Sequence, residues 1–191
     1  MQVKSIKTRE EKAILILKKG GVGVIPTDTI YGIVGSAFSK NAVAKIYKLK
    51  RRNPKKPLIV LIGSLVDLKK FGVWEKTDSA VKKRIRNLWP GKVSIIFPCA
   101  SKKFSYLHRG TKTIAFRLPA KKWIRKILVK TGPLIAPSAN TETHPPAKTI
   151  NEARAYFGNR VDFYIDGGKV FSKPSTLIKI KKGGGIDTIR N

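Results

Sequence analysis

Residues 21–35 have the sequence GVGVIPTDTIYGIVG, in which an apolar run ends in a group of polar side chains. The run GVGVIP predicts a buried β-strand, because short apolar runs bounded by glycine and proline are typical of strands. Thr27, Asp28, Thr29 and Tyr31 follow where that strand ends. Asp28 either binds a cation or holds nearby hydroxyls and amides in a turn, and the structural role is the favoured interpretation.

On both sides of this stretch, helical and strand patterns alternate. Caps and apolar periodicity predict helices over 8–19, 39–50, 77–89, 120–131 and 150–157, and a short helix after Ser64. Apolar, β-branched and aromatic runs predict strands near 21–26, 58–62, 93–98, 113–119, 161–166, 175–180 and 186–190. Such interleaving indicates parallel strands with helical crossovers, and the closing strand, turn, strand pattern adds an antiparallel component. We therefore expect one α/β domain over 1–191.

The chain is strongly basic. Its 191 residues include 41 Lys plus Arg and 11 Asp plus Glu, for a formal charge of +30. Such a surface attracts polyanions, so nucleotides, RNA and anionic membranes are all candidate partners. A compositional bias that spreads lysines over solvated faces explains the excess about equally well. The placement of the charge is therefore more informative than its total.

Several classes of function are disfavoured by composition. Cys99 is the one cysteine, and His108 and His144 are the two histidines, so no disulfide framework, zinc constellation or thiol mechanism is expected. The amino-terminal residues are charged and lack the apolar region of a signal peptide, and no apolar run reaches the length of a membrane span. We expect a soluble, cytoplasmic protein without a membrane partner and without a protein-bound metal site.

Two segments have the composition of an anion-binding site. Residues 48–58, KLKRRNPKKPL, are densely cationic, and no acidic residue occurs between Asp28 and Asp67. Residues 136–146, APSANTETHPP, place small and hydroxyl side chains after an apolar strand, where backbone amides can approach a phosphate closely. A lysine-rich surface loop and a simple Ser/Asn turn are the alternatives. The two segments together favour a phosphate site more than either does alone.

Arg117 lies inside an otherwise apolar predicted strand. An unpaired buried guanidinium is costly, so Arg117 should contact a carboxylate or a phosphate, either from the protein or from a ligand. Because the chain has so few acidic residues, we expect the ligand to be the partner.

Six blocks in this order, IPTDTIYG, KLKRRNPKKPLIV, LWPGKVSIIFP, TIAFRLPA, GPLIAPSAN and KPSTLI, resemble the YrdC-like threonylcarbamoyl-AMP synthases in their short, single-domain form. The resemblance extends over about residues 10–190. It implies an open, twisted, mixed parallel and antiparallel sheet with flanking helices around a positively charged cavity. The implied enzyme is a nucleotidyltransferase that condenses L-threonine, bicarbonate and ATP into threonylcarbamoyl-adenylate and pyrophosphate, for threonylcarbamoyladenosine modification of tRNA.

The resemblance also implies roles for individual residues. Lys50 and Arg52 would be catalytic by neutralising the triphosphate together with Mg²⁺ bound to ATP. The residues implied for ATP binding are Lys50, Arg52, Lys56, Thr113, Ser138, Asn140 and Arg190. The residues implied for threonine binding are Thr29, Tyr31, Arg117, Ala136 and Ser175. The polar group that follows the first strand would then be part of an amino-acid pocket.

Leu61, Pro146 and Lys179 depart from residues that are common in the family at these positions, which bears on the details of the pockets. The alternative function is a non-catalytic module of the same fold that binds double-stranded RNA or tRNA through a basic concave face. A carbamoyl-transfer domain of the hydrogenase-maturation type is a second alternative, but such domains belong to larger chains with zinc-finger-like segments that one cysteine cannot supply. Proteins of the later threonylcarbamoyl-transfer step are expected partners of the enzyme.

Overall fold

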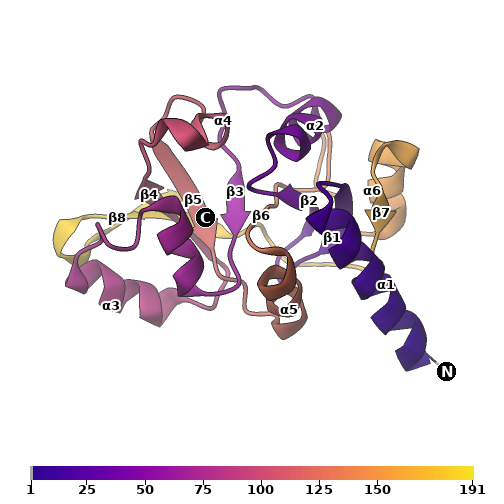
Figure 1. Ribbon diagram of the computed structural model, residues 1–191, viewed down its shortest axis with the longest axis horizontal. Coiled ribbons are helices and arrows are strands. Elements are labelled where there is room, and N and C mark those ends of the chain that lie inside the picture. Colours follow the sequence, from indigo (N-terminus) through magenta and orange to yellow (C-terminus); the bar gives the residue numbers. More distant parts are fainter. Residues whose placement is uncertain (1) are drawn as a thin grey trace.

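The computed structural model describes residues 2–191, with side chains described from residue 9 onward. Nine strands form one sheet in the order β7-β1-β2-β6-β3-β5-β4-β8-β9. Figure 1 shows the strands crossing the middle of the molecule with helices arranged around them. The bounds of the strands are β1 Val22–Pro26, β2 Tyr31–Ser36, β3 Ile59–Leu61, β4 Val93–Pro98, β5 Thr113–Arg117, β6 Leu134–Ile135, β7 Phe163–Tyr164, β8 Thr176–Ile180 and β9 Ile186–Arg190.

The helices occupy the connections. The α-helices are α1 Gln2–Lys18, α2 Lys40–Lys50, α3 Ser79–Leu88, α4 Ser105–His108, α5 Lys122–Thr131 and α6 Ile150–Phe157. The 3₁₀ turns are η1 Leu65–Phe71, η2 Lys102–Phe104, η3 Gly158–Arg160 and η4 Lys182–Gly184. Side-chain caps begin α2, α3 and α6, where Ser39, Asp78 and Thr149 accept a backbone N–H of the first turn.

The sheet is mixed, as the sequence predicts. β1 pairs with β7, β3 with β5 and β4 with β8 in parallel, whereas β1–β2, β2–β6, β3–β6, β4–β5 and β8–β9 are antiparallel. Parallel pairs need long crossovers, which accounts for the helices between most of the strands. The expected open, mixed α/β sheet with flanking helices is confirmed.

Two apolar clusters pack on the two faces of the sheet. In β3, the side chain of Val60 joins a large cluster with α2, α3, α4 and α6, whereas Leu61 joins a smaller cluster with α1 and α5. Ile33 and Val34 of β2 divide in the same way, because successive side chains of a strand point to opposite faces. The two helices α1 and α5, which also contact each other, therefore cover one face.

Two expectations about elements were wrong. The amino-terminal helix begins at Gln2, whereas the sequence analysis placed its start at Thr8, which lies within the helix. The segment from Tyr31 to Ser36 is a buried strand, β2, that pairs with β1 as a hairpin, whereas the sequence analysis predicted no strand there. Its two glycines obscure the strand pattern, because glycine weakens strand propensity.

Among residues 2–191, no helix combines the length and the apolar composition that crossing a membrane requires.

Candidate functional site

A cavity of about 390 Å³ opens above the centre of the sheet. Its volume lies within the range of ligand pockets, about 300–1,000 Å³. Ile59 of β3 and three alternate residues of β5, Thr113, Ala115 and Arg117, line it. Since Leu61 shares the face of Ile59 and packs with α5, the cavity lies on the same face of the sheet as α1 and α5.

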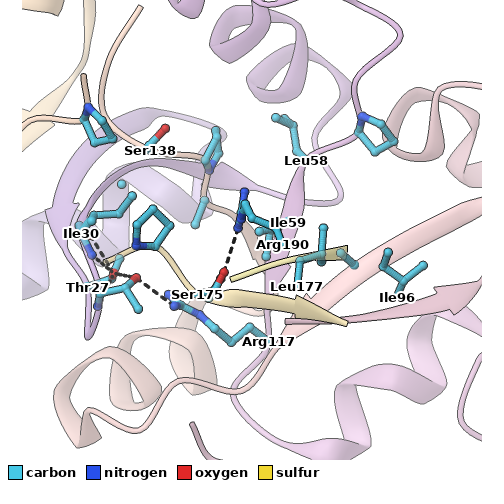
Figure 2. A pocket seen from close by; sticks show the side chains of 18 of the residues that line it. Thr27, Ile30, Leu58, Ile59, Ile96, Arg117, Ser138, Ser175, Leu177 and Arg190 are labelled. Atoms are coloured by element: carbon cyan, nitrogen blue, oxygen red, sulfur yellow. Dashed lines mark hydrogen bonds between the residues drawn. The ribbon is translucent and has the colours of Figure 1, made fainter. Parts of the chain in front are cut away.

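The turn between β1 and β2 forms one wall of the cavity (Figure 2). The Thr27 hydroxyl oxygen accepts the backbone N–H groups of Thr29 and Ile30 at 3.1 and 3.2 Å, and the hydroxyl lies 2.7 Å from the Ile30 carbonyl oxygen. These bonds close the hairpin. The polar residues after the first strand are thus a turn whose hydroxyl groups, those of Thr27 and Thr29, lie at the cavity wall and 3.0 Å apart.

Arg117 reaches this turn from β5. Its Nη1 donates to the Thr29 hydroxyl at 2.9 Å, and its Nη2 lies 3.2 Å from Oδ1 of Asp28. Arg117 is 4% exposed, and its Nε has no protein partner. Burial lowers the pKa of Arg117, and the Asp28 carboxylate opposes that shift. Asp28 thus supplies a buried protein carboxylate, which is the alternative that the sequence analysis ranked below a ligand.

Asp28 has a structural role, as the sequence analysis favoured. Its Oδ2 accepts the backbone N–H of Ala120 at 3.0 Å, so the same carboxylate contacts the segment after β5 and the guanidinium at its end. Asp28 thereby fixes the β1–β2 turn relative to Arg117 and to the loop that follows β5.

The segment after β6 lies along the end of β2. Ala139 donates its N–H to the Tyr31 carbonyl oxygen at 2.8 Å, and Ser138 bridges to Gly32. Ala136, Pro137 and Ser138 line the cavity. This segment therefore contributes the Ser138 hydroxyl and its own backbone to the cavity wall.

The carboxyl-terminal strands complete the wall. Ser175, which immediately precedes β8, is buried, and its hydroxyl lies 2.8 Å from that of Ser94. Arg190 of β9 donates from Nη2 to the Ser175 carbonyl oxygen at 2.9 Å, which turns its guanidinium toward the cavity (Figure 2). The pKa of Arg190 is lowered, first by burial and then by the charge of Arg52.

Arg52 enters the wall from the loop after α2. Its Nη2 donates to the Pro57 carbonyl oxygen at 3.0 Å, and its Nε donates to that of Lys56 at 3.3 Å. In the part of the chain that the structure describes, each charged side chain in the wall is an arginine, namely Arg52, Arg117 or Arg190. Three converging guanidinium groups favour an anionic ligand.

Lys50 has a different position from the one expected. The residue is 1% exposed, and its ammonium donates to the carbonyl oxygens of Ser138 and Asn140, at 2.6 and 2.7 Å, and to Oδ1 of Asn140 at 3.1 Å. Burial and the charge of Arg52 lower the pKa of Lys50 to about 7, whereas Glu142 raises it. Lys50 does not line the cavity. Its ammonium instead points to residues 138–140 and forms its three hydrogen bonds with that loop.

Three other expected ligands also lie outside the wall. The Tyr31 hydroxyl donates to the Gly168 carbonyl oxygen at 2.7 Å and accepts the Gly167 N–H at 2.9 Å, which orients it toward the 166–168 loop. Asn140 is buried, and its side chain bonds to Lys50 and to its own loop. Lys56 is directed to Glu142, with which it forms an ion pair of 2.7 Å.

The structure thus brings together eight of the residues named from the sequence. Those that line the cavity are Thr29, Arg52, Thr113, Arg117, Ala136, Ser138, Ser175 and Arg190. Sequence reasoning missed the wall positions of Thr27 and Thr111 and the pairing of Asp28 with Arg117. A signal was present for Thr27 and Asp28, because both belong to the polar group after the first strand. Of the three departures from the family pattern, only Pro146 lines the cavity.

Within residues 9–191, no group of three or more His, Cys, Asp or Glu side chains is arranged to hold a metal ion. The oxygen donors of the cavity wall are neutral hydroxyls, including those of Thr27, Thr29 and Ser138.

Comparison with known proteins agrees with this fold. The Sua5, YciO and YrdC family model, described as telomere recombination, matches residues 15–191. Threonylcarbamoyl-AMP synthase of Coxiella burnetii is 31% identical over 157 residues, which cover 81% of this chain and 83% of that protein. Threonylcarbamoyl-AMP synthase of Hahella chejuensis is 30% identical over 169 residues, which cover 87% of this chain and 91% of that protein.

Among solved structures, Sua5 of P. abyssi complexed with L-threonine superposes with a TM-score of 0.82 at 27% identity, over 90% of this chain and 50% of that chain. The present chain thus corresponds to about half of that protein. An open mixed sheet with an arginine-lined cavity defines an α/β protein that is suited to an anionic ligand. The chain belongs to the Sua5, YciO and YrdC family.

Proposed function

We propose that this protein is a threonylcarbamoyl-AMP synthase, which condenses L-threonine, bicarbonate and ATP into threonylcarbamoyl-adenylate and pyrophosphate. The observation that carries the proposal is the convergence of Arg52, Arg117 and Arg190 on one cavity whose wall also holds threonine and serine hydroxyls. Relatives that bear this enzyme's name over most of their length support it.

The proposed threonine subsite lies beside the β1–β2 turn. Arg117 would hold the substrate carboxylate, because its guanidinium is fixed by Asp28 and Thr29 and its position needs no reorganisation on binding. Ala136 and Ser175 would border the substrate side chain from the other walls. The threonine complex of P. abyssi Sua5, a structural neighbour of this chain, supports an amino-acid subsite in this fold.

The proposed nucleotide subsite lies between Arg52, Ser138 and Arg190, with Thr113 on the β5 wall. Arg52 and Arg190 lie close enough for the charge of Arg52 to lower the pKa of Arg190. Among the residues that the structure describes, the cavity wall contains no carboxylate that could neutralise either guanidinium. Such a pair of guanidinium groups is stabilised when a polyphosphate binds between them. Mg²⁺ bound to the phosphates would neutralise further charge there.

The proposed reaction needs positioning and charge neutralisation more than a protein nucleophile. The amine of threonine and bicarbonate form a carbamate with loss of water. An oxygen of the carbamate then attacks the α-phosphorus of ATP, and the bond to the leaving pyrophosphate breaks. Arg52 would stabilise the charge that develops on the leaving group, and Arg117 would orient the carbamate. Lys50 and Asn140 would act as positioning residues that hold Ser138.

The product is a mixed anhydride, and threonylcarbamoylation of adenosine in tRNA, with the help of transfer proteins, is the proposed use of its activated carbonyl. A test incubates the pure protein with ATP, L-threonine, bicarbonate and Mg²⁺ and measures pyrophosphate, with threonine omitted as the control. Release that needs threonine supports the enzyme. A mobility shift of double-stranded RNA without release would instead support the RNA-binding module, and the salt dependence of that shift would report the number of phosphate contacts.

A further inference from the structure

Glu142 is an isolated acidic residue that contacts two segments of the chain, both of which lack acidic residues. No Asp or Glu occurs over 29–66 or over 79–141. The loop of residues 51–56, which follows α2, belongs to the first segment, and the stretch that leads to Glu142 belongs to the second. A single carboxylate here therefore faces a strongly cationic part of the chain.

The Glu142 carboxylate is bound by two donors of the 51–56 loop. The backbone N–H of Asn53 donates to Oε2, and the Lys56 ammonium lies 2.7 Å from Oε1. The Glu142 backbone N–H in turn donates to the Lys50 carbonyl oxygen at 2.7 Å. The donors, a backbone amide and an ammonium, hold the pKa of Glu142 below its usual value. They are also the groups with which proteins commonly bind phosphate.

This contact is adjacent to the cavity along both segments of the chain. Arg52 and Pro57 flank the donors on one segment, and Ser138 and Pro146 flank Glu142 on the other. All four flanking residues line the cavity. The Glu142 side chain is 21% exposed and the Lys56 side chain is 59% exposed, so both are open to solvent beside residues that line the cavity.

The backbone beside Glu142 is strained. Thr143 has φ 79°, in a region that β-branched residues rarely adopt. Strain of this kind persists only where the surrounding contacts impose it. Thr143 lies between Glu142, which is bound to the 51–56 loop, and His144, whose carbonyl oxygen accepts from the Asn140 amide at 2.6 Å. Release of the carboxylate would remove one of the restraints on this turn and would leave the bond from the Glu142 N–H to the Lys50 carbonyl oxygen in place.

We propose that Glu142 is an internal anion that occupies the phosphate-binding donors of the 51–56 loop until the polyphosphate of the substrate displaces it. The identity of that polyphosphate as ATP rests on the proposed function. Displacement would free Lys56 and the Asn53 N–H for the terminal phosphates and would let the 140–144 loop relax. If the contact were purely structural, Glu142 would instead hold the 51–56 loop in place for the ligand. Neutralising the carboxylate should strengthen polyphosphate binding if Glu142 competes with the ligand, and should weaken it if Glu142 only positions the loop.

The test measures the binding of inorganic tripolyphosphate to the full chain by calorimetry at constant ionic strength. Glu142→Gln keeps the size of the side chain and removes its charge, and we expect about three- to tenfold tighter binding. Glu75→Gln is the matched control, because it makes the same change of net charge at an exposed residue with no ion-pair or hydrogen-bond partner among the described residues. The control should bind as the unmodified chain does.

A second pair of variants identifies the donor. In the Lys56→Met background, Glu142→Gln should increase tripolyphosphate affinity by less than it does in the unmodified chain, because only the Asn53 N–H is then left to be released. Unchanged or weaker binding by Glu142→Gln alone, or an equal gain from Glu75→Gln, would overturn the proposal. Tripolyphosphate binding needs neither threonine nor turnover, so failure here is distinguishable from failure of threonine-dependent pyrophosphate release.

Discussion

The side-chain nitrogen of Lys50 lies 2.6 Å from the carbonyl oxygen of Ser138. The lysine that ends α2 therefore fixes the loop that carries the cavity serine, from behind the cavity wall. Lys50 and Ser138 are 88 residues apart in the chain, and their contact links the cationic loop to the segment after β6. The basic side chain that touches the cavity from this region is that of Arg52.

Replacement of Lys50 should primarily reduce stability. Lys50→Met leaves the carbonyl oxygens of Ser138 and Asn140 without their buried donor, and we expect the free energy of unfolding to fall by about 2–4 kcal/mol. Denaturant unfolding measures the change. Lys48→Met is the control, because Lys48 is exposed on the same helix and its loss should matter by less than about 0.5 kcal/mol. Equal stabilities of the two variants would contradict the assigned role.

Replacement of Arg52 should primarily reduce activity. Arg52→Ala removes a guanidinium from the cavity wall but leaves the buried core intact, so we expect kcat/KM for pyrophosphate release to fall about 100- to 1,000-fold. The free energy of unfolding should change by less than about 1 kcal/mol. Steady-state kinetics and denaturant unfolding on the same sample separate the two effects. Near-normal turnover of Arg52→Ala would contradict the role of Arg52 in the reaction.

The buried ion pair between Asp28 and Arg117 should be costly to break. Asp28→Asn leaves the buried guanidinium without its counter-ion, and we expect a loss of about 3–5 kcal/mol in the free energy of unfolding. Asp187→Asn breaks the Lys181–Asp187 pair, in which the side chains are 61% and 44% exposed, and should cost at most about 1 kcal/mol. Similar losses from both variants would show that the Asp28 pair is effectively solvated.

Glu142 should contribute to the acid sensitivity of the fold. Because its pKa is lowered in the folded state, the carboxylate stabilises the protein above its unfolded pKa of about 4.3. That contribution is lost as the pH falls through the lower folded pKa. The free energy of unfolding of Glu142→Gln should therefore decline less steeply below about pH 4.3 than that of the unmodified chain. Parallel declines would show that the ion pair with Lys56 does not contribute.

Much of the fold can be predicted from local sequence. Ser39, Asp78 and Thr149 mark helix starts because each can accept a backbone N–H, and α2, α3 and α6 begin where they occur. The strand Tyr31–Ser36 could not be predicted in this way, since its burial comes from neighbours on both sides in the sheet. Tertiary pairing there outweighs local propensity.

The candidate site was predicted in part. Arg117 and Ser138 could be placed from the resemblance, and both line the cavity. The direction of the Lys50 side chain could not, because α2 buries its last residue against a loop that is distant in sequence. The partner of Arg117 was missed for the same reason, since Asp28 lies in the turn between β1 and β2, far from Arg117 in the sequence. Which basic residue meets a ligand and which is internally paired is decided by tertiary contacts.

The most direct test of the proposed chemistry follows the carbon of bicarbonate into the product. The protein is incubated with ATP, L-threonine, Mg²⁺ and bicarbonate labelled with carbon-13, and the quenched mixture is analysed by mass spectrometry. We predict a threonylcarbamoyl-adenylate that is heavier by the mass difference of the isotope and that disappears when threonine is omitted. An adenylate without the label, or pyrophosphate release that does not need threonine, would contradict the assignment of the cavity.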